Sequence, residues 1–300
     1  MTTPYTSPTA VEAAIRSAAR EATRHDPSLT VQERIRLEYF HRFLCRVFSP
    51  PGHVHWLLKG GTAMLARVPS ARATTDIDLL NGSGSLQAAL TELRTIAQED
   101  LGDFFRFEYV GHAESLGAGQ PYARGFRVNF DVLIGATKKD RLSIDLVVGS
   151  ITTAPPDVMT PTNVLALPRL PQSSYRLYSV IDQVADKVCA TISTYDGHPS
   201  SRAKDLVDLV VLALTQPMQS APLRAALLRE SSARGLQLPS AFAVPSGWAA
   251  TYRKLASRVP ICSGHLDLTA AEALVDRLLK PVLTNQSSNQ HWLAQPAEWA

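Results

Sequence analysis

Apolar residues recur along the chain with two different periods, and the two patterns separate a mixed front half from a helical back half. A repeat of about four residues runs through residues 31–48, where one apolar stripe indicates an amphipathic helix. Short apolar runs then indicate strands at residues 55–58, 73–80 and 104–111. A helical period over residues 85–101 lies between the last two. Strands and helices are therefore expected to alternate in this part of the chain.

Two β-rich runs at residues 125–135 and 140–150 flank Ala-Thr-Lys-Lys and predict a hairpin. A proline-rich stretch at 155–171 then has the composition of a boundary or of a loop that crosses between lobes. Helices are expected after it at about 175–195, 202–215, 220–234, 247–257 and 268–283. We predict an α/β (α+β) fold with two lobes: an α/β domain with N-terminal helices and a mixed sheet at 1–160, and a mainly helical domain at 161–300 that completes a cleft.

The composition is that of a folded protein. The 300 residues are 45% hydrophobic and 19% charged, and 30 basic side chains against 27 acidic ones give a net charge of +3. This balance excludes a polycationic nucleic-acid coat, so a polyanionic partner would have to meet a local basic patch. The three cysteines have no metal-ligand spacing, and no signal peptide or membrane span is recognisable. A cytoplasmic protein without membrane contact is expected.

Carboxylates at strand positions are the first candidate chemistry. On a strand, Asp76 and Asp78 share one face while Ile77 and Leu79 point to the core. Asp145 stands in a second apolar run in the same way. Such a set can bind Mg²⁺, which takes oxygen ligands from one or two carboxylates and from substrate phosphates. Three converging carboxylates would support a two-metal reaction, whereas the pair alone is also compatible with an exposed strand face.

A glycine turn precedes these carboxylates. Lys59-Gly60-Gly61-Thr62 joins a predicted strand to a predicted helix, a place where backbone N–H groups and the helix dipole favour phosphate. Neither a Walker loop nor a G-x-G-x-x-G motif is present. A Gly-Gly turn by itself is usually structural. Its combination with two nearby acidic strand positions is much rarer.

Together these residues resemble the polymerase-β-like nucleotidyltransferase superfamily. Its signature is a Gly-Gly or Gly-Ser turn, a spacer, D-h-D and a later h-D-h, where h is apolar; here the spacer between Gly61 and Asp76 is 14 residues. The Lys-Gly-Gly-Thr-Ala string and Arg-x-Thr-x-Asp-Ile-Asp at 72–78 are similar to the AbiEii/MenT group of nucleotidyltransferase toxins from bacterial toxin–antitoxin and abortive-infection pairs. The group's downstream lysine and R-x-K-D-x-x-D segment match Lys187 and residues 202–208. The resemblance spans residues 55–212.

The resemblance implies a toxin that transfers a nucleoside monophosphate from an NTP to RNA, with the 3′ acceptor end of tRNA as the expected target and translation blocked as the result. It implies Mg²⁺ as cofactor, with Mn²⁺ as a substitute, and a cognate antitoxin protein as partner. The expected metal ligands are Asp76, Asp78 and Asp145. The expected catalytic residues are these three with Lys187 and Asp205. The expected nucleotide-binding residues are Lys59, Gly60, Gly61, Thr62, Arg72, Thr74, Lys187, Arg202 and Asp208.

The helical residues also have a direct physical interpretation. Lys187 follows an apolar helix stripe, so its stem can be buried while its ammonium reaches a phosphate. Arg202, Asp205 and Asp208 share one face of the next helix, where an intrahelical ladder of ion pairs is the alternative to a functional role. The sequence does not decide between Asp205 and Asp208 as the functional acid.

The sequence leaves two possible roles for each of two residues in the 72–78 segment. Arg72 can clamp a phosphate, or pair with Asp76 and orient it. Thr74 can orient a metal-bound carboxylate, or serve only as a residue with high β propensity.

Two other functions remain compatible with the sequence. One is a transferase of the same fold that modifies a small hydroxyl compound or a protein side chain. The other is a catalytically silent module that binds a nucleotide, RNA or a partner protein. The preferred NTP, the acceptor and the oligomeric state do not follow from the sequence.

Overall fold

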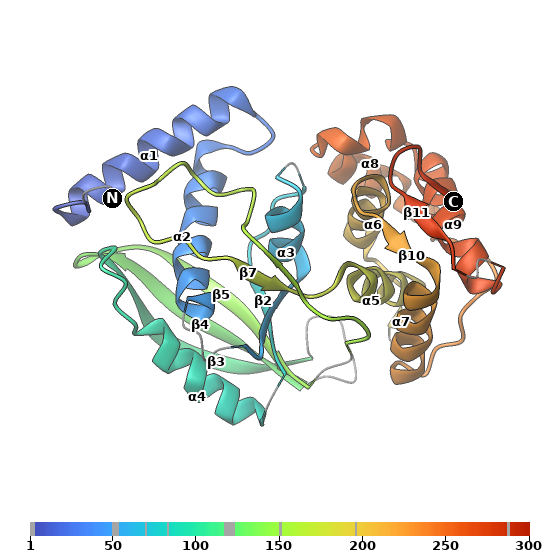
Figure 1. Ribbon diagram of the computed structural model, residues 1–300, viewed down its shortest axis with the longest axis horizontal. Helices are drawn as coiled ribbons and strands as arrows, with labels where there is room; N and C mark the ends of the chain where they lie inside the picture. Colours follow the sequence, from blue (N-terminus) through green and yellow to red (C-terminus); the bar gives the residue numbers. More distant parts are fainter. Residues whose placement is uncertain are drawn as a thin grey trace.

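The computed structural model describes residues 4–49, 54–69, 71–82, 84–116, 124–149, 152–195, 197–286 and 289–300. They form two lobes that lie side by side (Figure 1). The sheet lobe comprises the described residues up to 177, and the helical lobe those from 180 onward. The expected α/β class with a mixed sheet is confirmed.

A seven-stranded sheet organises the first lobe, in the order β3-β4-β5-β2-β1-β7-β6. Its strands are β1 (Trp56–Lys59), β2 (Ile77–Asn81), β3 (Phe105–Leu116), β4 (Arg124–Ile134), β5 (Thr137–Val148), β6 (Asp157–Met159) and β7 (Tyr175–Leu177). The pairs β2/β5 and β1/β7 are parallel and the other neighbours are antiparallel. The helices of this lobe are α1 (Pro8–His25), α2 (Val31–Phe48), α3 (Gly60–Arg67) and α4 (Leu86–Ala97).

Helix α2 is the core of the sheet lobe. Its start is fixed by a capping box, in which Thr30 and Glu33 bind each other's backbone N–H groups. Its second half is buried, including Arg46, whose guanidinium donates two hydrogen bonds to Asp103 at 3.0 and 2.8 Å. Both side chains of that pair are fully buried. The pair ties α2 to the loop that leads into β3.

The β4–β5 hairpin is present, but the expected Ala-Thr-Lys-Lys connection is wrong. The turn is Gly135–Ala136, and β5 already begins at Thr137. Gly135 has φ of 60°, which permits a two-residue turn. Both lysines lie on the strand and form ion pairs there, Lys138 with Asp131 and Lys139 with Glu12.

The helix expected at 175–195 begins later. Tyr175–Leu177 is instead β7, which pairs with β1 in parallel, and α5 (Val180–Ile192) starts after Ser179 caps it. Three consecutive residues with two buried apolar side chains suit a sheet position as well as a helix, so the pattern did not separate the two. The change from sheet to helices thus comes after residue 177, later than the boundary expected at residue 160.

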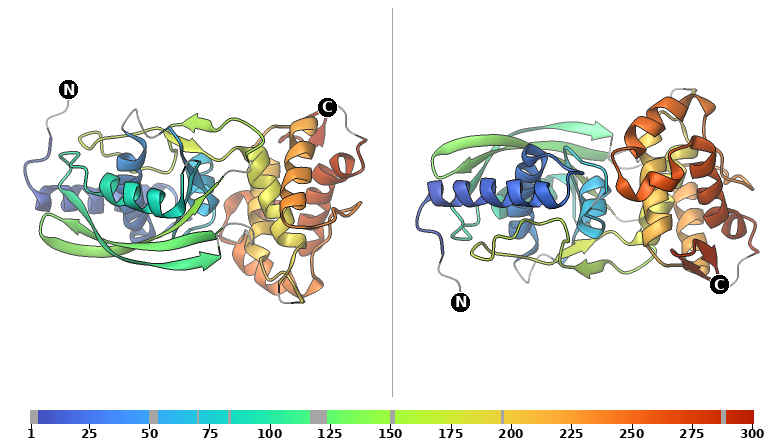
Figure 2. Two further views of the ribbon diagram at one scale, coloured as in Figure 1. Left: turned by 90° about the horizontal axis from the view of Figure 1, so that it is seen from below. Right: turned by 90° about the horizontal axis from the view of Figure 1, so that it is seen from above.

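The second lobe is a group of packed helices. Its elements are α5, α6 (Ala203–Thr215), α7 (Ser220–Ala233), α8 (Ala249–Ala256), α9 (Leu268–Leu283), the short helices η2 (Ser246–Trp248) and η3 (Pro260–His265), and the small strands β8 (Thr194–Tyr195), β9 (His198–Pro199), β10 (Met218–Gln219), β11 (His291–Leu293) and β12 (Glu298–Trp299). Helix α5 lies on the side that faces the sheet lobe (Figure 2). No described helix has the length and apolar character needed to cross a membrane.

Candidate active site

Four charged side chains form a row across the sheet. Strand pairing places Lys59 of β1 opposite Asp78 of β2, Asp78 opposite Asp145 of β5, and Asp145 opposite Arg127 of β4. Residues directly opposite on neighbouring strands share a face. This charged row therefore has two carboxylates in its centre and one cation at each end.

Asp76 adds a third carboxylate beside the row. The strand expected at 73–80 begins only at Ile77, so Asp76 lies just before it. Thr74 donates a hydrogen bond from Oγ1 to Asp76 Oδ1 at 3.1 Å, and Thr62 donates from Oγ1 to the carbonyl of Asp76 at 2.8 Å. Burial, followed by the charges of Asp76 and Asp145, raises the pKa of Asp78 to about 6. The carboxylates are held close together although they repel each other.

The glycine turn packs directly onto Asp78. Gly60 is the first residue of α3 and has φ of 60°, a left-handed conformation that glycine adopts without strain. A Cβ atom at this position would lie 1.8 Å from Oδ2 of Asp78. Gln183 of α5 donates from Nε2 to the carbonyl of Gly60 at 3.1 Å, so the helical lobe also contacts the turn. Only glycine allows the turn and the carboxylate to approach this closely.

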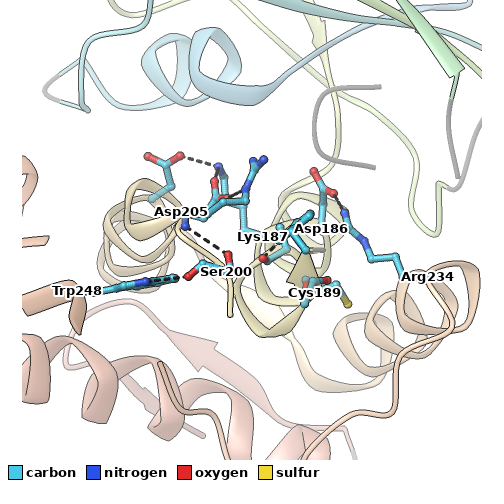
Figure 3. A network of polar contacts seen from close by, with 12 residues as sticks. Asp186, Lys187, Cys189, Ser200, Asp205, Arg234 and Trp248 are labelled. Atoms are coloured by element: carbon cyan, nitrogen blue, oxygen red, sulfur yellow. Dashed lines mark hydrogen bonds and ion pairs between the residues drawn. The ribbon is translucent and has the colours of Figure 1, made fainter. Parts of the chain in front are cut away.

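Side chains of both lobes form a charge cluster, defined here as Arg72, Lys187, Arg202, Asp205 and Asp208. Nζ of Lys187 lies 3.2 Å from Oδ1 of Asp205 and 2.5 Å from Oδ2 of Asp208. Arg202 pairs with Asp205 through Nε. Figure 3 shows Lys187 and Asp205 extending toward each other from α5 and α6. Both aspartate side chains are at most 2% exposed.

Arg72 joins this cluster from the sheet lobe. Its Nε and Nη2 each donate to one oxygen of Asp208 at 3.0 Å. The structure thus pairs Arg72 with Asp208 rather than with Asp76, one of the two partners considered from the sequence. The ladder considered as the alternative forms only between Arg202 and Asp205, because Asp208 pairs with Arg72 and Lys187 instead.

The charged groups of this cluster shift each other's pKa values. Burial opposes ionisation of Asp205, but Lys187 and Arg202 lower its pKa to about 2. Burial also opposes the charge of Lys187, and its pKa is nevertheless raised because Asp208 and Asp205 favour the ammonium. Three cations thus face two carboxylates, which leaves the cluster with an excess of positive charge.

One cavity of about 480 Å³ brings the two lobes' charges together, a size within the usual range of about 300–1,000 Å³ for small-molecule sites. Of the residues expected in the site, its lining includes Lys59, Gly60, Gly61, Arg72, Thr74, Asp76, Asp78, Asp145, Lys187, Arg202 and Asp205. Thr62 and Asp208 lie behind this surface and hold other site residues. Asp205, not Asp208, is therefore the acid of α6 that faces the cavity.

The carboxylates fit a divalent cation that is bound together with a phosphate. Within the described ranges, no group of three or more His, Cys, Asp or Glu side chains is arranged to hold a metal ion by itself. Asp145 is engaged elsewhere, because Arg127 donates to both of its oxygens at 2.8 Å. Mg²⁺ commonly uses one or two carboxylates and completes its shell with water and substrate phosphates. Asp76 and Asp78 provide such a pair, and the pKa of Asp78 is raised by burial and then by the charges of Asp76 and Asp145.

Comparison with known families identifies the family to which this chain belongs. A family model described as nucleotidyl transferase AbiEii toxin, type IV TA system, matches residues 42–293. The chain belongs to the AbiEii family. As an AbiEii protein it is a nucleotidyltransferase of a toxin–antitoxin system, as the resemblance implied.

Two crystal structures from Helicobacter pylori resemble this AbiEii chain. One, described as a candidate nucleotidyltransferase, is 14% identical, with 85% of this chain and 98% of that chain covered and a TM-score of 0.47. The other, JHP933, is 16% identical, with 83% and 94% covered and a TM-score of 0.45. No curated protein matches the chain.

The AbiEii cavity is also lined by charged residues that were not among the expected site residues. They are Arg127 of β4, Asp186 of α5 and Lys204 of α6. Asp186 points to Arg234, the residue that follows α7, and forms an ion pair with it (Figure 3). Arg127 lies between the buried residues Phe126 and Val128 of β4. This alternation of apolar and polar residues is visible in the sequence and would have been a signal that Arg127 lies on the same face of the sheet as Asp145.

The close approach at Gly60 predicts a large effect of a single methyl group. Gly60→Ala is expected to lower nucleotidyl transfer by roughly 100-fold or more, because a shift of about 1 Å in a reacting group costs on this order. Steady-state kinetics with the purified variant measures this. Gly102→Ala is the matched control: Gly102 has a similar φ of 67° but nothing within 4 Å of the added Cβ. If both variants lose activity equally, contact with Asp78 is not the reason.

The raised pKa of Asp78 predicts that the stability of the metal-free protein depends on pH. A pKa raised to about 6 means that the folded state binds the proton more tightly than the unfolded state. This contribution is fully present below about pH 4, the ordinary value for Asp, and is lost as the pH rises through about 6. Thermal unfolding in EDTA should therefore show a steeper loss of Tm between pH 4 and 7 for the wild type than for Asp78→Asn. Parallel curves would contradict the assignment.

Proposed function

We propose that this AbiEii toxin transfers a nucleoside monophosphate from an NTP to RNA, with the 3′ end of tRNA as acceptor and with Mg²⁺, or Mn²⁺ in its place, as cofactor. The observation that supports the proposal is that three carboxylates of the sheet lobe and cations of the positive charge cluster line one cavity. An NTP with its metal ion has the complementary pattern, because it carries both a cation and several phosphate charges.

The triphosphate would lie between the N-terminus of α3 and the charge cluster. The first N–H groups of α3 and the ammonium groups of Lys59 and Lys187 provide hydrogen-bond donors there. Lys59 also lies over the ring of Tyr178, with Nζ 4.4 Å from the ring centre. Because Asp208 already binds Arg72 on both oxygens, we assign Arg72 to positioning this cluster rather than to clamping a phosphate.

The reaction needs a proton acceptor and a fixed line of attack. The acceptor hydroxyl oxygen forms a bond to the α-phosphorus, the bond from that phosphorus to the pyrophosphate oxygen breaks, and the hydroxyl proton passes to a carboxylate, which we assign to Asp145. Asp76 and Asp78 would hold the metal ion, with Thr74 orienting Asp76. When bound, the ion stabilises negative charge on the phosphate oxygens.

Macromolecular partners would meet the outer part of the cavity. Lys204 is exposed and Arg127 is half exposed, and both line the cavity, where they can contact an RNA backbone. The type IV toxin–antitoxin family implies a cognate antitoxin protein as a further partner.

A transfer assay with several acceptors tests the proposal. The protein and Mg²⁺ are incubated with each α-labelled NTP in turn, together with total tRNA, and the products are separated into RNA, protein and small molecules. Label in RNA supports the proposal. Label in the protein fraction instead would identify the side-chain transferase, and label in a small hydroxyl compound added as acceptor would identify the third possibility. An Asp76→Ala variant that still arrests growth would identify a catalytically silent module.

A further inference from the structure

The pair between Arg127 and Asp145 is the least expected feature of the cavity. Nε and Nη2 of Arg127 donate to the two different oxygens of Asp145, both at 2.8 Å. The arginine side chain is 52% exposed, whereas the carboxylate is only 10% exposed. A half-exposed residue thus binds a nearly buried group of the site through two hydrogen bonds.

The position of the pair distinguishes it from an ordinary surface ion pair. Asp145 is opposite Asp78 in the charged row, and Asp76 lies beside them. Arg141 and Asp131 form a comparable cross-strand pair on the same two strands, at 2.8 Å and with the arginine 51% exposed, but neither residue lines the cavity. Of these two pairs, the pair of Arg127 places its cation next to the carboxylates that can bind a metal ion.

A consequence follows for the third carboxylate. A guanidinium that binds both oxygens of Asp145 uses the positions from which a carboxylate prefers to bind a cation, and its charge repels a divalent ion nearby. This agrees with the finding that the described acidic side chains do not form a three-membered metal site. The backbone of the sheet does not need to change for Asp78 and Asp145 to bind the same ion, because the strand register already places the two residues side by side.

We propose that Arg127 is a latch that keeps Asp145 out of the metal site of the nucleotide-free enzyme and releases it when a nucleotide with its metal ion binds. The proposal rests on the proposed function of this cavity. The incoming triphosphate is an alternative partner for the guanidinium, since arginine pairs with phosphate in the same two-pronged geometry as with carboxylate. Arg127 can change partner by rotating its side chain, because half of that side chain is in solvent.

The latch gives the toxin a defined order of assembly. Without a nucleotide, the metal ion meets only Asp76 and Asp78, so the bare enzyme binds divalent cations weakly. With a nucleotide, Asp145 becomes free to accept the proton of the acceptor hydroxyl. Arg127 is thus a positioning residue that acts through Asp145.

Binding of Mn²⁺ to the nucleotide-free protein tests the latch without relying on activity. Titration calorimetry of Arg127→Gln is expected to show Mn²⁺ binding roughly tenfold tighter than in the wild type, which corresponds to about 1.4 kcal/mol. Arg141→Gln is the matched control and should bind like the wild type. In an Asp145→Asn background, Arg127→Gln should give a much smaller gain, because no carboxylate remains to be released.

The outcomes separate the latch from the function on which it rests. The latch is overturned if Arg127→Gln binds Mn²⁺ no more tightly than the wild type. The proposed site still stands in that case if, in the presence of a non-hydrolysable NTP, the wild type binds Mn²⁺ and Asp78→Asn does not. Loss of nucleotide-dependent Mn²⁺ binding in every protein, the wild type included, overturns the proposed function itself.

Discussion

Asp78→Asn is expected to lower nucleotidyl transfer on the order of 10³-fold or more while the protein stays folded. Asparagine keeps the shape of the side chain beside Gly60 but removes a charge that would bind the metal ion, and metal ions contribute several kcal/mol to such reactions. The same change relieves the repulsion from Asp76 and Asp145 that contributes to the raised pKa of Asp78. At neutral pH, Tm should therefore be unchanged or higher, a pattern expected of a residue that serves function at the expense of stability.

Asp186→Asn is the control for this experiment. Asp186 also lines the cavity but forms an ion pair with Arg234, so its loss should change transfer by less than roughly threefold. Transfer rates and growth arrest on expression provide two readouts. An Asp78→Asn protein that keeps a tenth of the activity, or that still arrests growth like the wild type, would contradict the assignment of the metal site.

Asp208→Asn is expected to lower the free energy of unfolding by roughly 3 kcal/mol or more. The substitution keeps the volume but removes the partner of two cations, Arg72 and Lys187, whose side chains are 16% and 7% exposed. Lys187 retains Asp205, whereas Arg72 loses its ion pair with the helical lobe and keeps at most one of its two hydrogen bonds there. Urea denaturation measures the change, provided that the slope with denaturant stays constant.

Two further variants test whether the loss of stability in Asp208→Asn comes from the unpaired cations of the charge cluster. Asp186→Asn should lower stability by less than about 1 kcal/mol, because Asp186 is partly exposed and Arg234 keeps Glu230 as a partner at 2.7 Å. Adding Arg72→Gln to Asp208→Asn should restore part of the stability by removing one uncompensated charge. If Asp208→Asn and Asp186→Asn are equally mild, the cluster does not join the lobes in the way described.

The periodicity of the sequence was sufficient for the long elements and insufficient for the short ones. Helix α2 and the β4–β5 hairpin have many apolar positions that repeat, so their type was predicted even where the turn at Gly135 was misplaced. Strand β7 has three residues, too few to show a period, and its place between β1 and β6 depends on long-range pairing. Pairing of this kind is not encoded in the local pattern.

Part of the candidate site was likewise predictable from the sequence, and part was not. Acidic strand positions and the Gly-Gly turn were recognisable because each combines a residue type with a defined element. The contact of Arg72 with Asp208 joins residues 136 positions apart, and it could not be chosen over Asp76 from the sequence. The contact between Arg127 and Asp145 follows from the register of β4 and β5, which the misplaced turn would have shifted.

Transfer to tRNA with a modified 3′ end tests the central claim most directly. Total tRNA is divided, one half is oxidised with periodate to destroy the terminal ribose hydroxyls, and both halves are incubated with the protein, Mg²⁺ and the α-labelled NTPs. We predict label in the intact tRNA, none in the oxidised tRNA, and none in either when Asp78→Asn replaces the wild type. Absence of label from intact RNA with all four NTPs would contradict the account.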